Sequence, residues 1–185
     1  MKSRAAVAFA AGEPLQIVEI DVAPPKAGEV LVKITHTGVC HTDAFTLSGD
    51  DPEGLFPVVL GHEGAGIVEA VGPEVRALQA GDHVVLSYGH CGICKQCVSG
   101  RPAYCVEFFG RNFSGADEQG GHAVCSHDHA AMHDHFFAQS SFASYAISRA
   151  SIAVNVDAGA LLAYPGPLGC GIPTGAGSVM NGLKL

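Results

Sequence analysis

The sequence has few charged residues, fewer basic than acidic ones, and no long apolar run, and each shortage excludes a class of protein. Charged residues make up 15% of the 185 positions and form no long run, which does not fit a disordered tail. No stretch approaches about 18 uninterrupted apolar residues, so we expect no membrane-spanning segment. The basic N-terminus lacks a long apolar core, so we expect no signal peptide and a cytoplasmic protein.

The shortage of basic residues argues against a nucleic-acid partner. Ten Lys and Arg against 18 Asp and Glu give a formal net charge of −8, and an acidic surface repels phosphate backbones. A zinc-ribbon nucleic-acid binder, which needs a basic face, is disfavoured for the same reason. Hydrophobic residues make up 48%, which is enough to bury a core in one domain and the start of a second.

Short strands joined by turns are the predicted structure, because 24 glycines and 10 prolines are scattered through the chain. Residues 41–47 and 174–183 favour short helices, and 88–141 show no clear periodicity and favour loops. Together these signals indicate a mainly β protein built as an irregular barrel. The predicted strands are 5–9, 15–21, 30–37, 65–71, 83–87, 142–147 and 152–156.

Four of the seven cysteines lie in one short stretch, HCGICKQCVSGRPAYC, with the spacing C-x2-C-x2-C-x7-C. Four thiolates form a closed tetrahedral site for Zn²⁺, and such a site holds shape without room for a substrate. The alternative is four unrelated thiols, one of them reactive. The predicted structural zinc ligands are Cys91, Cys94, Cys97 and Cys105.

Three motifs, the cysteine stretch among them, resemble one known family. GVCHTDAFTLSGDDPEGLFPVVLGHEGAGIVEAVG is similar to the catalytic-zinc segment of the zinc-dependent, medium-chain alcohol dehydrogenases. The cysteine stretch resembles the structural zinc lobe of that family, and GCGIPTGAGSV resembles the segment that holds its third catalytic ligand. The motifs follow one another in family order along the whole chain. The resemblance therefore implies a GroES-like catalytic domain with a zinc-binding lobe.

The resemblance also implies a second metal site. Cys40, His62 and Cys170 would bind a catalytic zinc, with water or the substrate oxygen as fourth ligand. Asp43 would orient His62, and Glu63 would approach the metal during ligand exchange. Two structural roles remain open as alternatives: Cys40 could instead be a buried apolar thiol, and Glu63 could form a buried ion pair.

Proton transfer and cofactor contacts follow from the same resemblance. Thr42 would accept the alcohol proton, His41 would contact the pyrophosphate of a nicotinamide dinucleotide, and Thr174 would contact its nicotinamide ring. Each has a structural alternative. His41 could be an exposed residue at a helix start, Thr42 and Asp43 could serve the N-terminal end of that helix, and Thr174 could cap the last helix.

Two branches of the family are candidates for the substrate. Asp51 matches an acidic position of the glutathione-dependent formaldehyde dehydrogenases (class III), but Phe109 stands where that branch has a carboxylate-binding arginine, with Arg111 displaced. The stretches PAYCVEFFGRNFSGAD and HFFAQSSFASYAISR are more similar to aryl-alcohol dehydrogenases. Phe108 and Phe109 would suit an apolar pocket wall or plain core packing. Phe45 replaces the histidine that ends the proton relay in some members.

A histidine-rich stretch, GHAVCSHDHAAMHDHFF, could form a third metal site. Its Asp and Ala spacers favour instead a polar surface loop that binds metals only adventitiously. The candidate ligands there are His122, Cys125, His127, His129, His133 and His135.

The sequence shows no G-x-G-x-x-G fingerprint after a strand, so a Rossmann domain for the dinucleotide is predicted to be missing. We expect a catalytic domain at 1–172, with its structural zinc lobe at about 88–110, and the start of the dinucleotide domain at 173–185. The expected chemistry is NAD-dependent oxidation of a primary or aromatic alcohol, with two Zn²⁺ as cofactors. S-(hydroxymethyl)glutathione is the second candidate substrate, and a non-catalytic zinc-binding module is the alternative class.

The expected partners of the chain are few. One is a small alcohol or aldehyde. The other is a second copy of the chain, because an uncovered domain face would expose apolar surface. We expect little or no turnover from the isolated 185 residues.

Overall fold

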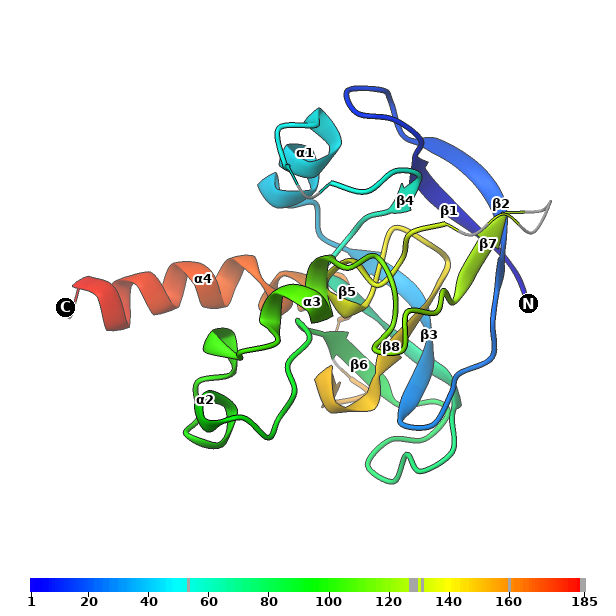
Figure 1. Cartoon of the computed structure of the whole chain (residues 1–185). Coiled ribbons are helices and arrows are strands. Elements are labelled where there is room, and N and C mark those ends of the chain that lie inside the picture. The colour runs from blue at the N-terminus through cyan, green and yellow to red at the C-terminus, as the bar shows by residue number, and fades with distance from the viewer. Residues whose placement is uncertain (53, 127–129, 131, 160, 184–185) are drawn as a thin grey trace.

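Two antiparallel sheets form the body of the protein in the computed structural model, which describes residues 1–52, 54–126, 130, 132–159 and 161–183 (Figure 1). The first sheet has the strand order β4-β1-β2-β7 and the second has the order β8-β3-β5-β6-β9. The strands are β1 (Lys2–Ala8), β2 (Gln16–Val22), β3 (Glu29–Thr37), β4 (Val58–Val59), β5 (Gly64–Val71), β6 (His83–Leu86), β7 (Val124–Ser126), β8 (Tyr145–Arg149) and β9 (Ala153–Val156).

Burial on strand β3 explains how the sheets share a core. Leu31 contacts a cluster between the sheets that includes Ile20 and Ile147, whereas Val30 and Val32 point to the other side, into a second cluster. Successive side chains of a strand point to opposite faces, so a continuous apolar run indicates a strand covered on both sides. The sheets therefore curl around apolar side chains, as in a half-barrel.

Short helices connect the strands and carry the motifs of interest. The α-helices are α1 (His41–Ser48), α2 (Lys95–Val98), α3 (Phe108–Phe113) and α4 (Gly171–Gly177). Helix α4 continues into the π-helical turn η5 (Ser178–Leu183), and together they extend away from the barrel (Figure 1). The 3₁₀ segments are η1 (Pro102–Tyr104), η2 (Phe136–Ala138), η3 (Ala150–Ile152) and η4 (Gly166–Gly169).

The structure confirms the mainly β barrel and most of the expected elements. The hairpin of the first two strands is present as β1 and β2, and helix α1 spans the expected range with one residue more. The expected strand 142–147 is displaced to β8, and the expected loop 88–141 also contains α2, α3 and β7. The helix expected from 174 begins at Gly171 instead. Within the described residues, no helix is long and apolar enough to cross a membrane.

Candidate metal centres

One cluster gathers metal-ligating side chains from three separate parts of the chain. Cys40 immediately precedes α1, His62 and Glu63 lie between β4 and β5, and Cys170 lies between η4 and α4. One ligand atom from each of these four residues lies within 4.8 Å of every other. Two thiols and an imidazole at such distances are a ligand set typical of a catalytic zinc.

Close backbone approach brings the three segments together. Glu63 is 4% exposed; its backbone carbonyl accepts a hydrogen bond from Gly38 N–H (3.0 Å), and its Oε1 accepts one from Gly171 N–H (2.9 Å). A Cβ at Gly38 would overlap Glu63 Oε2, so a larger residue there would displace the Glu63 carboxylate. Glu63 thereby ties the segment with Cys170 to the segment with His62, and within the described residues it forms no ion pair.

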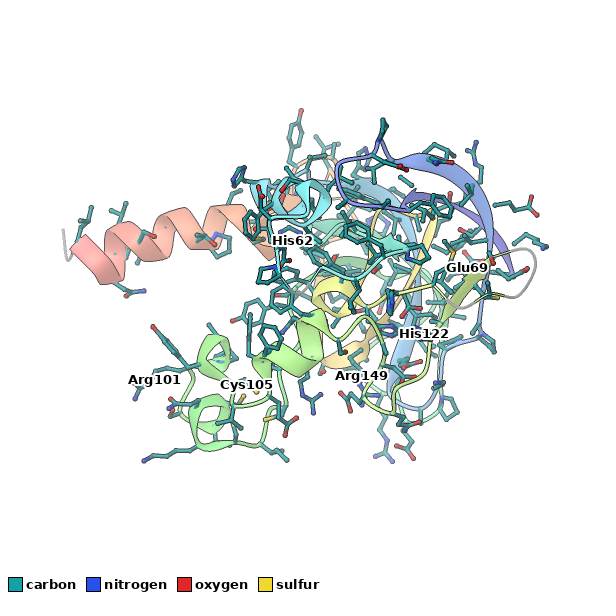
Figure 2. All side chains as sticks on the ribbon, turned by 45° about the horizontal axis from the view of Figure 1, so that its top comes forward. His62, Glu69, Arg101, Cys105, His122 and Arg149 are labelled. Atoms are coloured by element: carbon teal, nitrogen blue, oxygen red, sulfur yellow. The ribbon has the colours of Figure 1, made fainter. Side chains whose placement is uncertain are left out.

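His62 is held in the orientation that a metal ligand needs. Its Nδ1 lies 3.1 Å from Asp43 Oδ1, and both side chains are buried. Its Nε2 is buried and has no hydrogen-bond partner among the described residues. An acceptor on Nδ1 fixes the tautomer that leaves Nε2 free of hydrogen, so the unpartnered nitrogen can bind a metal. In Figure 2, His62 lies near the place where α4 leaves the barrel.

The electrostatics of the cluster depend on burial and on its internal contacts. Burial disfavours the Cys40 thiolate, but the backbone and hydroxyl of Thr42 and the neighbouring His62 imidazole outweigh it and lower the pKa of Cys40. Burial lowers the pKa of His62, yet the contact with Asp43 prevails and raises it above the usual value. Burial and the charges of Cys40 and Glu63 raise the pKa of Cys170 to about 12. A divalent cation would offset this crowding of negative groups.

The residues expected to move protons and bind cofactor lie close to the cluster in sequence. Thr42 Oγ1 is 3.7 Å from Cys40 Sγ, within reach of the cluster. Because Cys40 is the N-cap of α1, Thr42 is not a capping residue, whereas Asp43 Oδ2 does accept from Cys40 N–H at 3.1 Å. His41 is exposed at the start of α1. Thr174 is exposed within α4, where its hydroxyl donates to the Cys170 carbonyl (2.9 Å) instead of capping a helix.

The second cluster is the four-cysteine lobe, which contains α2 and lies apart from His62 (Figure 2). The four sulfurs lie within 4.8 Å of one another. Backbone N–H groups donate to two of them: Cys94 to Cys91 Sγ (3.3 Å), and both Cys91 (3.3 Å) and Glu107 (3.4 Å) to Cys105 Sγ. Such donors stabilise thiolates, so the four sulfurs form a ligand set suited to a cation such as Zn²⁺.

The thiols of this lobe differ in their tendency to ionise. Hydrogen bonds from the backbone of Cys97 and Val106 lower the pKa of Cys94 to about 6. Burial and the neighbouring sulfur of Cys94 raise the pKa of Cys97 to about 12. Burial opposes ionisation of Cys105, but N–H donors of Cys91 and Glu107 lower its pKa. Four sulfurs this close together cannot all be thiolates without a cation, because the negative charges repel one another. A bound Zn²⁺ would supply the compensating positive charge.

The residues on which the choice of substrate branch depends lie on α3 and on or just after α1. Arg111 is paired with Glu107 and Glu118, so its guanidinium is engaged on the lobe side of the molecule. Phe109 is 51% exposed and its ring is 5.2 Å from that of Phe113. Asp51 accepts a hydrogen bond from Thr46 Oγ1 (2.8 Å). Phe45 and Phe108 lie on α1 and α3, and Phe45 is exposed.

The histidine-rich stretch does not form a third ligand set within the described residues. Asp134 is its centre: it pairs with His135, accepts from the N–H groups of Ala123 and Val124, and lies 3.9 Å from His122. The His122 and His133 rings are 5.7 Å apart. Two of the expected candidates, His127 and His129, lie outside the described residues, and Cys125 lies on β7.

Two aromatic residues beside the cluster were not predicted from the sequence. The Phe137 ring stacks on the His62 ring at 4.5 Å, and the Phe136 ring meets it edge-on at 5.7 Å. Phe113 from α3 contacts both of these phenylalanines. The FF dipeptide ends the histidine-rich stretch, and no periodicity there indicates which residues it faces. The result is an apolar wall next to the candidate metal site.

Comparison with known proteins agrees with this geometry. The family "Alcohol dehydrogenase GroES-like domain" matches residues 26–157. The chain is 53% identical, over its whole length, to an S-(hydroxymethyl)glutathione dehydrogenase of Synechocystis and 50% identical to one of Escherichia coli. It covers 50% of each of these relatives, so it spans about half of their length.

Solved structures give the same result for the fold. An alcohol dehydrogenase zinc-binding domain protein from Burkholderia ambifaria is 53% identical with a TM-score of 0.95, and the match covers 100% of this chain and 50% of that one. Benzyl alcohol dehydrogenase from Acinetobacter calcoaceticus is 53% identical with a TM-score of 0.92, over 100% of this chain and 49% of that one. The chain therefore belongs to the alcohol dehydrogenase GroES-like domain family and corresponds to the N-terminal half of the zinc-dependent, medium-chain alcohol dehydrogenases.

Proposed function

We propose that this chain is the catalytic part of a zinc- and NAD-dependent dehydrogenase that oxidises a primary or aromatic alcohol to the aldehyde. The observation that carries the proposal is the convergence of Cys40, His62 and Cys170 on one point, in a chain that also has a separate four-cysteine set in the lobe. The buried and unpartnered Nε2 of His62 supports a metal at that point.

The residues present would divide the work as follows. Cys40, His62 and Cys170 would hold a zinc that polarises the substrate oxygen, and a nicotinamide dinucleotide would take the hydride. Asp43 keeps the His62 ring in the metal-binding orientation through Nδ1. Thr42 would accept the proton of the alcohol, and the 3.7 Å distance from its hydroxyl to the sulfur of Cys40 supports this role.

The remaining roles belong to the same proposal. Glu63 supports the segment that carries Cys170 and would approach the metal during ligand exchange. His41 and Thr174, both exposed beside the cluster, would contact the dinucleotide. Cys91, Cys94, Cys97 and Cys105 would hold the second, structural zinc.

The aromatic wall favours an aromatic alcohol as substrate. The partly exposed Phe137 ring stacks on the ring of His62, with the buried Phe136 behind it, and an aromatic substrate beside His62 would continue this packing. S-(hydroxymethyl)glutathione is the second candidate, because the curated relatives of equal identity carry that activity in their names. Against it, Arg111 is already paired with Glu107 and Glu118, so it is not free to bind a substrate carboxylate.

Metal analysis of three purified proteins tests the proposal. We expect about two zinc ions per wild-type chain, and about one in Cys40→Ser and in Cys94→Ser, each variant losing a different zinc. Since Cys94→Ser could unfold the lobe, circular dichroism should accompany the count. A wild-type chain with one zinc, all of it lost in Cys94→Ser, would leave only a non-catalytic zinc-binding module.

Turnover by the isolated chain forms a second readout. With NAD⁺ and benzyl alcohol we expect little or no activity from these 185 residues, and activity restored when a dinucleotide-binding domain is supplied separately. Faster restored oxidation of S-(hydroxymethyl)glutathione than of benzyl alcohol would select the second substrate.

A further inference from the structure

Gln139 is a buried polar residue that the proposed mechanism does not use. Its exposed fraction is 1%, and its carboxamide forms three hydrogen bonds to backbone. Oε1 accepts from Gly64 N–H (3.0 Å), while Nε2 donates to the carbonyls of His62 (3.0 Å) and Ser87 (3.0 Å). Both amide hydrogens and the oxygen are thus used, so the side chain has one satisfied orientation.

The positions of these partners show what the carboxamide does. His62 and Gly64 flank Glu63, and a strand residue in parallel register would bond to the same two backbone groups. Gln139 therefore takes the place of a neighbouring strand. It gives the backbone at His62 and Glu63, directly before β5, the kind of hydrogen bonds that a paired strand would have. Its third bond fixes this segment to Ser87, the first residue after β6.

The segment that carries Gln139 has a strained backbone, so hydrogen bonds must hold it in place. Residues other than glycine rarely adopt positive φ, and such a conformation persists only where the surrounding structure holds it. Two hydroxyl bonds fix the segment on either side: Ser140 Oγ donates to the Val59 carbonyl (2.6 Å) and accepts from Phe136 N–H (2.9 Å). The strained residues are His135 (φ 57°), Phe137 (φ 50°), Ala138 (φ 58°) and Ser140 (φ 50°).

The strained segment continues into residues that pair with the ligand-bearing segment. Ser141 N–H donates to the Gly61 carbonyl (2.9 Å), one residue before His62, and Phe142 N–H donates to the Leu60 carbonyl (3.0 Å). Within this pairing Gln139 is the side chain that contacts the backbone of a ligand residue itself. A merely space-filling residue would not need an amide there.

We propose that Gln139 is a positioning residue that holds His62 and Glu63 in the geometry required for the catalytic metal. This inference rests on the proposed function, because it assumes that Cys40, His62 and Cys170 bind zinc. Gln139 acts through the backbone and touches neither metal nor substrate. The lobe cysteines, which it does not contact, should be indifferent to its loss.

Zinc affinity measured by chelator competition tests the proposal in the full chain. In Gln139→Met, which keeps an unbranched side chain of similar size and removes all three hydrogen bonds, we expect the three-ligand site to bind zinc about 10- to 100-fold more weakly. The lobe zinc should keep its wild-type affinity. Gln139→Glu keeps the acceptor for Gly64 N–H and loses both donors, so it should also weaken only the three-ligand site.

Two control variants separate positioning from general destabilisation. Gln16→Met makes the same chemical change at an exposed position of β2 and should bind both metals as wild type does. Ile147→Val removes one methyl group from the buried core and lowers stability without touching His62. If Gln139 acts by positioning, Ile147→Val retains wild-type zinc affinity even where its thermal stability falls as far as that of Gln139→Met.

The outcomes of these measurements are distinct. Wild-type zinc affinity in both Gln139 variants would overturn the inference. It would also be overturned if the Gln139 variants lost zinc affinity equally at the three-ligand site and at the lobe, and Ile147→Val lost as much. If Gln139→Met does not fold, as lost lobe zinc would show, the result for Gln139→Glu decides. Zinc bound only at the lobe of the wild-type chain would instead overturn the proposed function itself.

Discussion

At the scale of single residues, Asp43 connects two segments that are far apart in the sequence. Its buried carboxylate accepts hydrogen bonds from Cys40 N–H (3.1 Å), Gly61 N–H (2.9 Å) and the His62 ring (3.1 Å). In the sequence, helix capping and histidine orientation are alternative roles for this residue, and the structure shows both contacts. One carboxylate serves both because its two oxygens can accept several donors.

Replacing Asp43 by Asn should weaken metal binding. The amide keeps the shape but loses the charge that raises the basicity of His62, and its NH₂ group faces one of the N–H donors. We expect zinc affinity at the three-ligand site to fall about 10- to 100-fold, measured by chelator competition. Asp50→Asn, at an exposed position just after α1, is the matched control, and equal affinities in the two variants would contradict the account.

The sequence predicted individual site residues through family resemblance more than through spacing. Cys40, His62 and Cys170 are too far apart in sequence for spacing to bring them together, whereas the four lobe cysteines lie close enough for spacing to suggest a metal. No sequence pattern indicates that Gln139 and Phe137 contact His62, because these contacts depend on how the 135–142 segment packs in three dimensions.

At the scale of elements, the sequence predicted which segments form strands but not which strands pair with each other. The first half of the expected strand 142–147 pairs with β1: Ala6 N–H donates to Phe142 O and Ser144 N–H to Arg4 O, both at 2.8 Å. Its second half belongs to β8, which pairs with β3. The segment thus crosses from one sheet to the other, and alternation along one chain cannot show this change of partner.

The helices in and next to the lobe were not predicted from the sequence. Helix α2 has four residues and α3 has six, and helices this short show no readable 3.6-residue periodicity. Helix α3 contacts the barrel through Phe113, and we expect α2 to depend on a metal bound by the lobe cysteines. A cavity of about 740 Å³ lies between one side of α3, the loop that follows it and the barrel, and Glu118 at this cavity forms ion pairs with Arg111 and Arg149.

The loop after α3 is fastened to the barrel by a second contact with a predicted pH dependence. Asp117 pairs with Lys26 and accepts from the N–H groups of Gln119 and Gly121, and its side chain is 9% exposed. Burial opposes its ionisation, but these contacts lower its pKa from 3.8 to about 2. A lowered pKa stabilises the fold above about pH 4, and this stability is lost as the pH falls towards 2.

Substituting Asp117 by Asn should therefore destabilise the protein at neutral pH. We expect a loss of about 2 kcal/mol at pH 7 that shrinks to nothing near pH 2, measured as the difference in urea unfolding free energy between variant and wild type. Glu118→Gln removes a more exposed acid and should cost less than about 1 kcal/mol. A difference for Asp117→Asn that does not vary with pH would contradict this assignment.

At the scale of the whole molecule, the chain presents apolar residues beyond the barrel. Helix α4 and η5 extend from the body, and Ile172, Met180 and Leu183 are 50%, 70% and 66% exposed (Figure 1). Exposed apolar surface of this kind indicates contact with another domain or chain. That a second copy covers it stays a prediction, as does the division at residue 172.

The central claim is that distant residues form one metal site, and an anomalous scattering map of crystals of the zinc-loaded chain, recorded at the zinc absorption edge, tests it most directly. The account predicts two peaks, one among the four lobe sulfurs and one bounded by Cys40 Sγ, His62 Nε2 and Cys170 Sγ, with ligand distances of about 2.0–2.3 Å. A single peak in the lobe, with those three atoms too far apart to share an ion, would contradict it.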